Sequence, residues 1–143
     1  MASWGEVEGE VPEFAARVRT LFQARKHKTM ATLRADGSPR MSGIETTFDD
    51  GEVNFGSMPD SVKGRDLERD PRVALHSPSV DPPEGDAGAW VGEAKLSGRA
   101  VRAQGGYRVE IAEVVLTYLE LPAELLVIES WHPGRGHERR ART

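Results

Sequence analysis

The chain has 143 residues, a formal net charge of −4 and no cysteine. Its acidity argues against a general nucleic-acid-binding protein, and the absence of cysteine excludes disulfides, thiolate metal sites and cysteine nucleophiles. No apolar run approaches the roughly 20 residues of a membrane-spanning helix, and the N-terminus shows no signal peptide. These features predict one domain over residues 1–143 of a soluble, cytoplasmic protein without a nucleic-acid or membrane partner. Residues 1–10 and 136–143 are expected to be flexible tails.

The first half of the chain predicts one helix and a meander of antiparallel strands. Apolar residues at helical spacing over residues 12–25 mark the helix, and Pro12 suits its first turn. Residues 28–35 and 39–48 then predict two strands joined by a tight Asp36-Gly37 turn. A second glycine turn leads into a third strand, EVNFGSM.

The second half predicts a short inserted helix followed by further strands. Ser61 can cap a helix over SVKGRDLERD, and Pro71 ends it. RVALHSPS, AWVGEAKLSGRAVRA with a bend at Gly98, the β-branched YRVEIAEVVLTYLEL and LPAELLVIESW predict strands. Six or seven antiparallel strands with two helices indicate a mainly β protein. A small barrel is the expected form, because closure removes exposed strand edges.

The common catalytic and metal-binding patterns are missing. His27, His76, His132 and His137 have neither HxH nor HExxH spacing, so we interpret each as structural or exposed and expect no metal site. The chain also lacks GxSxG, P-loop and dinucleotide-binding motifs. No residue can be assigned as catalytic from these patterns.

One segment, residues 57–70, gathers basic groups in an acidic chain. If a helix begins near Ser61, its first N–H groups and its dipole favour an anion, and Lys63 and Arg65 add positive charge. Upstream, Gly56 and Ser57 would let a ligand approach the backbone closely. The alternative is a solvated surface helix whose acids balance its cations. Spacing alone leaves both interpretations open.

Two longer stretches add a resemblance. FGSMPDSVKGRDLERDPRVAL and KTMATLRADGSPRMSGIETTF resemble the two halves of the flavin-binding signature of the pyridoxamine 5′-phosphate oxidase-like split-barrel superfamily, and ESWHPGRGHERR is similar to its Trp-containing C-terminal end. Within the superfamily, the chain looks closest to the flavin/deazaflavin-dependent oxidoreductases that use coenzyme F-420 or FMN. The resemblance implies a six-stranded antiparallel split barrel that forms a homodimer, with two cofactor sites at the interface.

The resemblance also implies roles for individual residues. Ser61 and Lys63 would hold the cofactor phosphate, with Arg65 beside them and Ser57 at the strand end. The backbone of Met41, Ser42 and Gly43 would run along the flavin or deazaflavin ring. Trp131 of the partner subunit would pack near the ring, and Arg135 could reach a substrate or the cofactor. A core or interface position is the alternative for Trp131.

Two departures from the family pattern affect the site. Asp66 stands where many relatives have Asn, which would weaken the binding of an acidic cofactor. Only Gln104-Gly105-Gly106 connects two strands between which many relatives insert a helix, which would leave the site more open.

The resulting hypothesis is an oxidoreductase that uses a bound flavin or deazaflavin (F-420 favoured, FMN next) to transfer hydride to or from a small organic substrate. A non-catalytic flavin-, haem- or tetrapyrrole-binding carrier on the same barrel is the alternative.

Overall fold

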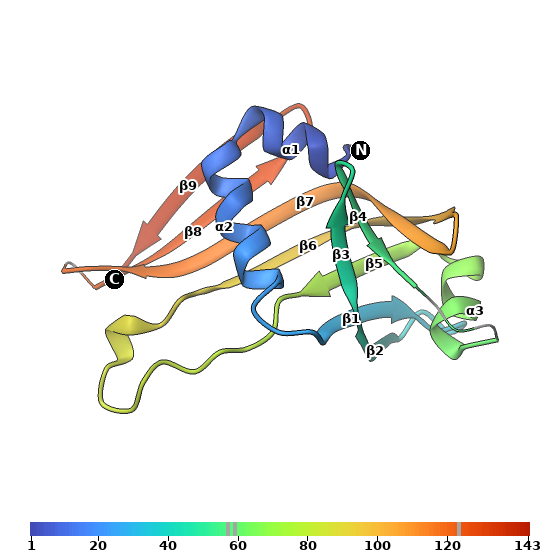
Figure 1. The fold of residues 1–143 in the computed structure, drawn as a ribbon, viewed down its shortest axis with the longest axis horizontal. Coiled ribbons are helices and arrows are strands. Elements are labelled where there is room, and N and C mark those ends of the chain that lie inside the picture. Colours follow the sequence, from blue (N-terminus) through green and yellow to red (C-terminus); the bar gives the residue numbers. More distant parts are fainter. Residues whose placement is uncertain (57, 59, 123) are drawn as a thin grey trace.

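The computed structural model describes residues 1–56, 58, 60–122 and 124–143, and it confirms a mainly β protein (Figure 1). Helices α1 (Trp4–Glu10) and α2 (Pro12–Phe22) precede the strands, and α3 (Val62–Arg69) lies in the loop between two of them. The described strands are β1 (Lys28–Leu33), β2 (Pro39–Ile44), β3 (Thr46–Asp49), β4 (Glu52–Phe55), β5 (Arg72–His76), β6 (Glu93–Ala103), β7 (Gly106–Glu120), β8 (Leu125–His132) and β9 (Gly136–Arg142). A single 3-10 turn, η1 (Ala87–Ala89), interrupts the long loop before β6.

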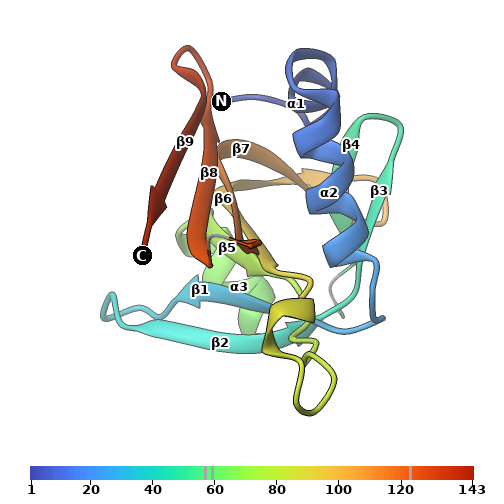
Figure 2. The same ribbon diagram turned by 90° about the vertical axis from the view of Figure 1, so that its left-hand side faces the viewer.

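The strands form one antiparallel sheet in the order β2-β1-β5-β6-β7-β4-β3, and β8 and β9 extend it from the other half of β7. The two ends of this order, β2 and β3, are consecutive in the chain, with only Glu45 between them. The sheet therefore curls into an open barrel whose split lies between β2 and β3 (Figure 2). This is the architecture of a split barrel.

The core lies between the sheet and the two N-terminal helices. Both helices stand between the β3–β4 hairpin and the strands β7–β9 (Figure 2). Phe48 of β3 contacts Trp4 and Phe22, with ring centroids 4.9 and 5.6 Å apart, so it joins α1 and α2 to the hairpin. Burial of such aromatic side chains supplies a large share of core stability.

The two ends of the chain, expected to be tails, have regular structure. Residues 4–10 form α1, because Ser3 caps it and Trp4 and Val7 are buried. Residues 136–142 form β9, which pairs with β8 over its whole length. Charge at the termini suggested solvated tails, whereas the buried apolar residues of α1 and the backbone pairing of β9 order both segments.

Several local predictions are confirmed, and one strand is divided. The Asp36-Gly37 turn joins β1 and β2, and the register of β6 with β7 shifts between Ser97 and Gly98, as expected for a bend there. The strand predicted over residues 39–48 is interrupted at Glu45, which makes β2 and β3 separate strands. Within the described part of the chain, no helix has the length and apolarity that a membrane crossing requires.

Candidate functional site

The start of α3 gathers the groups expected to hold an anion. Ser61 caps the helix, since its Oγ accepts from the Gly64 amide at 3.1 Å. Lys63 Nζ donates to the Gly43 carbonyl of β2 at 2.8 Å. The Arg65 amide donates to the Ser61 carbonyl at 3.1 Å, but its guanidinium has no hydrogen-bond or ion-pair partner among residues 1–56, 58, 60–122 and 124–143. The first amides of a helix have no intrahelical acceptor, so cations and free N–H groups meet at this end of α3.

Strand β2 offers an open edge beside these cations. It pairs with β1 on one side only, as the terminal strand of the sheet order. Because the Gly43 carbonyl accepts from Lys63, the backbone groups of Gly43 point away from β1, and those of Met41 share this direction. A Cβ added to Gly43 would meet nothing within 4 Å, and the Met41 side chain is 75% exposed. A flat ligand could therefore lie against this backbone.

A cavity of about 520 Å³ lies at the split of the barrel, and we call it the split hollow. Its lining residues are His27, Gly43, Ile44, Glu45, Gly56, Met58, Lys63 and Gly105. Three of them are glycines from separate segments, so much of the wall is bare backbone. The nearest atom to a Cβ at Gly56 would be 4.0 Å away, and Gly105 faces open space. The split hollow thus has room for a planar ring.

Titratable groups gather around Glu45 at the same place. Its Oε1 lies 3.5 Å from His27 Nε2 and 3.6 Å from Lys26 Nζ. On the neighbouring strand, burial lowers the pKa of Lys28, and the Glu45 carboxylate opposes this change. A carboxylate with an imidazole at a cavity wall can hold and move a proton.

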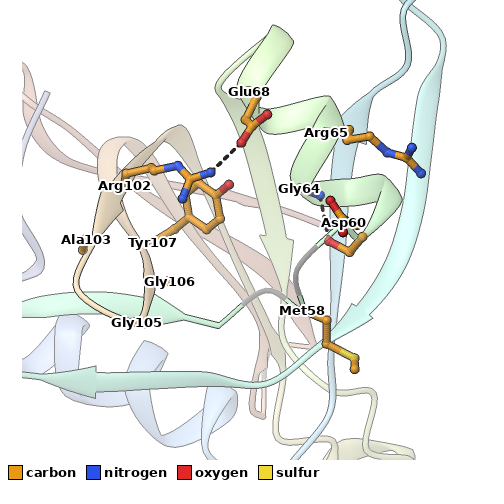
Figure 3. A pocket seen from close by; sticks show the side chains of 11 residues that line it. Met58, Asp60, Gly64, Arg65, Glu68, Arg102, Ala103, Gly105, Gly106 and Tyr107 are labelled. Atoms are coloured by element: carbon orange, nitrogen blue, oxygen red, sulfur yellow. Dashed lines mark hydrogen bonds and ion pairs between the residues drawn. The ribbon is translucent and has the colours of Figure 1, made fainter.

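A second cavity, of about 450 Å³, separates α3 from the β6–β7 turn, and we call it the turn hollow (Figure 3). Arg102 pairs with Glu68 across its upper side and lies over the Tyr107 ring, 5.7 Å from its centroid. Arg65 points away from this cavity, toward the β1–β2 side of α3 (Figure 3). Because the Gly105-Gly106 turn walls both this cavity and the split hollow, the short connection borders the site.

A third cavity, of about 540 Å³, lies between α3 and the β1–β2 turn, and we call it the arginine hollow. Its lining residues are Arg34, Ala35, Asp36, Arg40, Val62, Arg65, Asp66 and Arg69. Asp66 is 1% exposed and accepts from Arg40 Nε at 2.7 Å and from Thr32 Oγ1 at 2.8 Å. Burial would raise the pKa of Asp66, but the hydrogen bonds from Arg40 and Thr32 and the charges of Arg40 and Arg69 hold it below its ordinary value.

The structure brings most of the predicted site residues together but leaves Arg135 and Trp131 apart from them. Ser61, Lys63 and Arg65 lie on α3, next to the β2 segment of Met41, Ser42 and Gly43. Ser57 lies outside the described residues. Arg135 is in the β8–β9 turn, where it bonds Glu138 and His132, far from α3 in both views (Figures 1 and 2).

Trp131 takes the core position that the sequence left as an alternative. It is 1% exposed within its own chain, and its Nε1 donates to Glu10 Oε2 at 2.8 Å. A side chain buried in this way has no surface left to present to a ring bound by another subunit. The N-terminal helix that covers it was expected to be a tail, which is why the sequence could not decide its place.

Sequence reasoning named Asp66 as a departure from the family pattern and His27 as a structural or exposed histidine, but it missed Arg40 and Glu45, with which they pair at the hollows. Arg40 and Asp66 meet across the arginine hollow, and His27 and Glu45 meet at the split hollow. Arg40 and Asp66 are far apart in the sequence, and Glu45 stands at the break between β2 and β3, where the sequence predicted a continuous strand. For Arg40 and Glu45, the only signal in the sequence was that they flank the β2 segment that the resemblance implies to run along the ring.

The fold agrees with comparison to known proteins. The sequence profile of the family described as pyridoxamine 5′-phosphate oxidase matches residues 14–121. The chain belongs to this family. No curated protein matches the sequence.

Solved structures share the fold of this pyridoxamine 5′-phosphate oxidase family member at low sequence identity. PhzG from Burkholderia lata 383, in complex with tetrahydrophenazine-1-carboxylic acid, has a TM-score of 0.62 at 16% identity over 96% of this chain and 90% of its own. A pyridoxamine 5′-phosphate oxidase-related, FMN-binding protein from Nostoc punctiforme has 0.59 at 10% identity, over 100% and 98%. A heme-binding protein from Mycobacterium smegmatis has 0.57 at 15% identity, over 87% and 86%. At such identities the likeness concerns the fold alone.

Proposed function

We propose that this chain is an oxidoreductase that uses a bound flavin or deazaflavin to transfer hydride to or from a small organic substrate. Coenzyme F-420, an 8-hydroxy-5-deazaflavin, is favoured because the sequence looks closest to the flavin/deazaflavin-dependent oxidoreductases, and FMN is the alternative cofactor. The observation that carries the proposal is the bond from Lys63 Nζ to the Gly43 carbonyl. It sets the cations of α3 beside the open edge of β2 and the split hollow.

The residues present fit the two ends of such a cofactor. At the phosphate end, Lys63 and Arg65 offer positive charge, the Arg65 guanidinium having no partner within the described residues, and the Ser61 hydroxyl lies beside them at the start of α3. At the ring end, the backbone of Met41, Ser42 and Gly43 lies beside a hollow of about 520 Å³, within the range of roughly 300–1,000 Å³ usual for small-molecule sites.

The chemistry divides between cofactor and protein. The flavin or deazaflavin, when bound, supplies the hydride donor or acceptor. The chain binds its phosphate, orients its ring along β2 and, at His27 Nε2, holds a proton for the substrate with Glu45 as partner. The proposal includes a homodimer. Within one chain Arg135 lies too far from the site, so the arginine that reaches it would come from the second copy.

One observation favours a non-catalytic carrier of a flavin-, haem- or tetrapyrrole-type ligand as the second candidate. The side chains of His27 and Glu45 are 73% and 57% exposed, so the split hollow excludes little water around them. Proton and hydride transfer gain from a dry site, whereas storage of a ligand does not need one.

Two measurements separate these candidates. Titration with FMN and with coenzyme F-420, followed by absorbance and fluorescence, is expected to give micromolar binding of at least one of them. Reduced cofactor with an activated alkene as acceptor is then expected to be oxidised faster by wild type than by His27→Gln, at equal cofactor affinity. Binding without acceptor-dependent turnover would support the carrier, and no binding of either cofactor would overturn the oxidoreductase and leave only a carrier of a haem- or tetrapyrrole-type ligand.

A further inference from the structure

The arginine hollow contains its own counter-ion. Four arginines line it, and Asp36 and Asp66 are its only acids, so the net charge of the lining is +2. Asp36 lies at the β1–β2 turn, where its carboxylate accepts from Ser38. Asp66 is different, because its side chain is 2% exposed and its partners are cations of the hollow itself.

The Asp66 carboxylate holds two of the four guanidinium groups. Its Oδ2 accepts from Arg40 Nε at 2.7 Å, and its Oδ1 lies 3.5 Å from Arg69 Nη1. Arg69 Nη1 also donates to the Leu33 carbonyl at 3.3 Å. The terminal amino groups of Arg40 have no hydrogen-bond partner within the part of the chain that the structure describes. They remain available to an anion, but with one negative charge fixed next to them.

A fixed negative charge at this place acts on a ligand according to the ligand's charge. A phosphate monoester carries nearly two negative charges at neutral pH, whereas a phosphate diester carries one. Repulsion by a buried carboxylate therefore penalises the monoester about twice as strongly as the diester. Of the two proposed cofactors, FMN is a monoester and coenzyme F-420 is a diester.

We propose that Asp66 is a specificity-determining residue, which reduces the advantage that the positively charged arginine hollow gives a doubly charged phosphate monoester over a singly charged diester. The inference rests on the proposed function, because it concerns the phosphate of the same cofactor. It acts through Arg40 and Arg69, so Asp66 is a positioning residue that sets the net charge of the wall. The pKa of Asp66 lies below its ordinary value, so its carboxylate keeps its charge throughout the neutral range.

A series of three flavins with the same ring tests the proposal. Riboflavin, riboflavin 5′-methyl phosphate and FMN carry phosphate charges of zero, one and two. Asp66→Asn keeps the size and an acceptor for Arg40 and removes the charge. We expect it to tighten FMN by about five- to tenfold, the methyl phosphate by about two- to threefold and riboflavin not at all. Equal changes for all three flavins, or none, would overturn the inference, since a purely structural role would not follow ligand charge.

A second variant and a second probe keep the result decisive. If Asp66→Asn does not fold, Arg69→Gln, at an exposed side chain, leaves the Asp66 charge less compensated and is expected to weaken FMN more than the methyl phosphate. If wild type binds neither a flavin nor coenzyme F-420, the proposed function fails, and orthophosphate and dimethyl phosphate are titrated instead, followed by amide chemical shifts. Asp66→Asn is then expected to tighten orthophosphate more than dimethyl phosphate, and identical orthophosphate affinities in wild type and variant would contradict the inference.

Discussion

Two regions of the molecule handle charge in opposite ways: the α3 corner, formed by residues 61–65 and residues 41–43 of β2, and the β7–β9 wing, formed by strands β7, β8 and β9 and the helices packed on them. In the wing, Glu129 accepts from Tyr118 OH, lies 2.7 Å from His137 Nε2 and pairs with Arg17, whose guanidinium lies over the Tyr118 ring. In the corner, the Lys63 ammonium meets a backbone carbonyl, and Arg65 meets no carboxylate within the described residues. Charged groups that pair with one another suit a stabilising network, whereas cations that meet no carboxylate, beside the unpaired backbone of an edge strand, suit a binding site.

The largest effect is expected from the wing. Trp131→Ala removes a buried aromatic and its bond to Glu10, so the free energy of unfolding should fall by about 3–5 kcal/mol. Chemical denaturation measures this change. The matched change in the corner, Met41→Ala at a side chain 75% exposed, should leave the unfolding midpoint unchanged. Equal destabilisation by both variants would remove the contrast between the regions.

The corner should respond in affinity and not in stability. Lys63→Ala removes a charge-assisted contact with the phosphate, which is expected to weaken cofactor binding by about ten- to a hundredfold. Fluorescence titration gives this ratio. Arg72→Ala is the control, because this exposed cation already pairs with Asp70 and lines none of the three hollows. A similar loss in both variants would indicate a general charge effect.

Substitutions at two glycines test the same contrast between an effect on binding and an effect on stability. Gly43→Val adds bulk where nothing lies within 4 Å of a Cβ, so it should weaken ring binding by about tenfold at unchanged stability. Gly98→Ala would place a Cβ 1.9 Å from the Glu110 carbonyl oxygen and should instead lower the melting temperature. Binding that tolerates valine at position 43 would place the ring elsewhere.

The smallest effect concerns acid stability. The folded-state pKa of Asp66 lies below its unfolded value, so its contribution to stability is present above the unfolded pKa, near 4, and is lost as pH falls through the folded pKa. Melting temperatures from pH 6 downward should therefore fall more steeply in wild type than in Asp66→Asn. Parallel profiles would show that the Asp66 carboxylate gains nothing from Arg40 and Thr32. Arg72 lowers the pKa of Asp70 to about 2, so Asp70 also loses its stabilising contribution as pH falls, and it does so equally in wild type and in Asp66→Asn.

Local chemistry made much of the fold predictable. The Asp36-Gly37 turn, the Ser61 cap, the stop at Pro71 and the bend at Gly98 each follow from one or two residues, and all are confirmed. The cations of α3 were found in the same way, because a helix start and its charges are neighbours in sequence. These features need no knowledge of distant contacts.

Long-range pairing set the limit of prediction. Trp131 reaches Glu10 across 121 positions, and the polar C-terminal segment becomes β9 only because β8 offers it a partner. The same limit hid the pairing of Asp66 with Arg40, because Asp66 was named only as a departure from the family pattern and an arginine is ordinary on an edge strand. Neither periodicity nor composition records which charged groups will be buried together.

The central claim is that the α3 corner holds the phosphate of a flavin-type cofactor. It is tested most directly by comparing each cofactor with its phosphate-free form: FMN with riboflavin, and coenzyme F-420 with its bare deazaflavin ribityl chromophore. The account predicts that the phosphate tightens binding to wild type by about tenfold or more for at least one pair, and that Lys63→Ala removes this gain. Equal affinity with and without the phosphate in both pairs would contradict it.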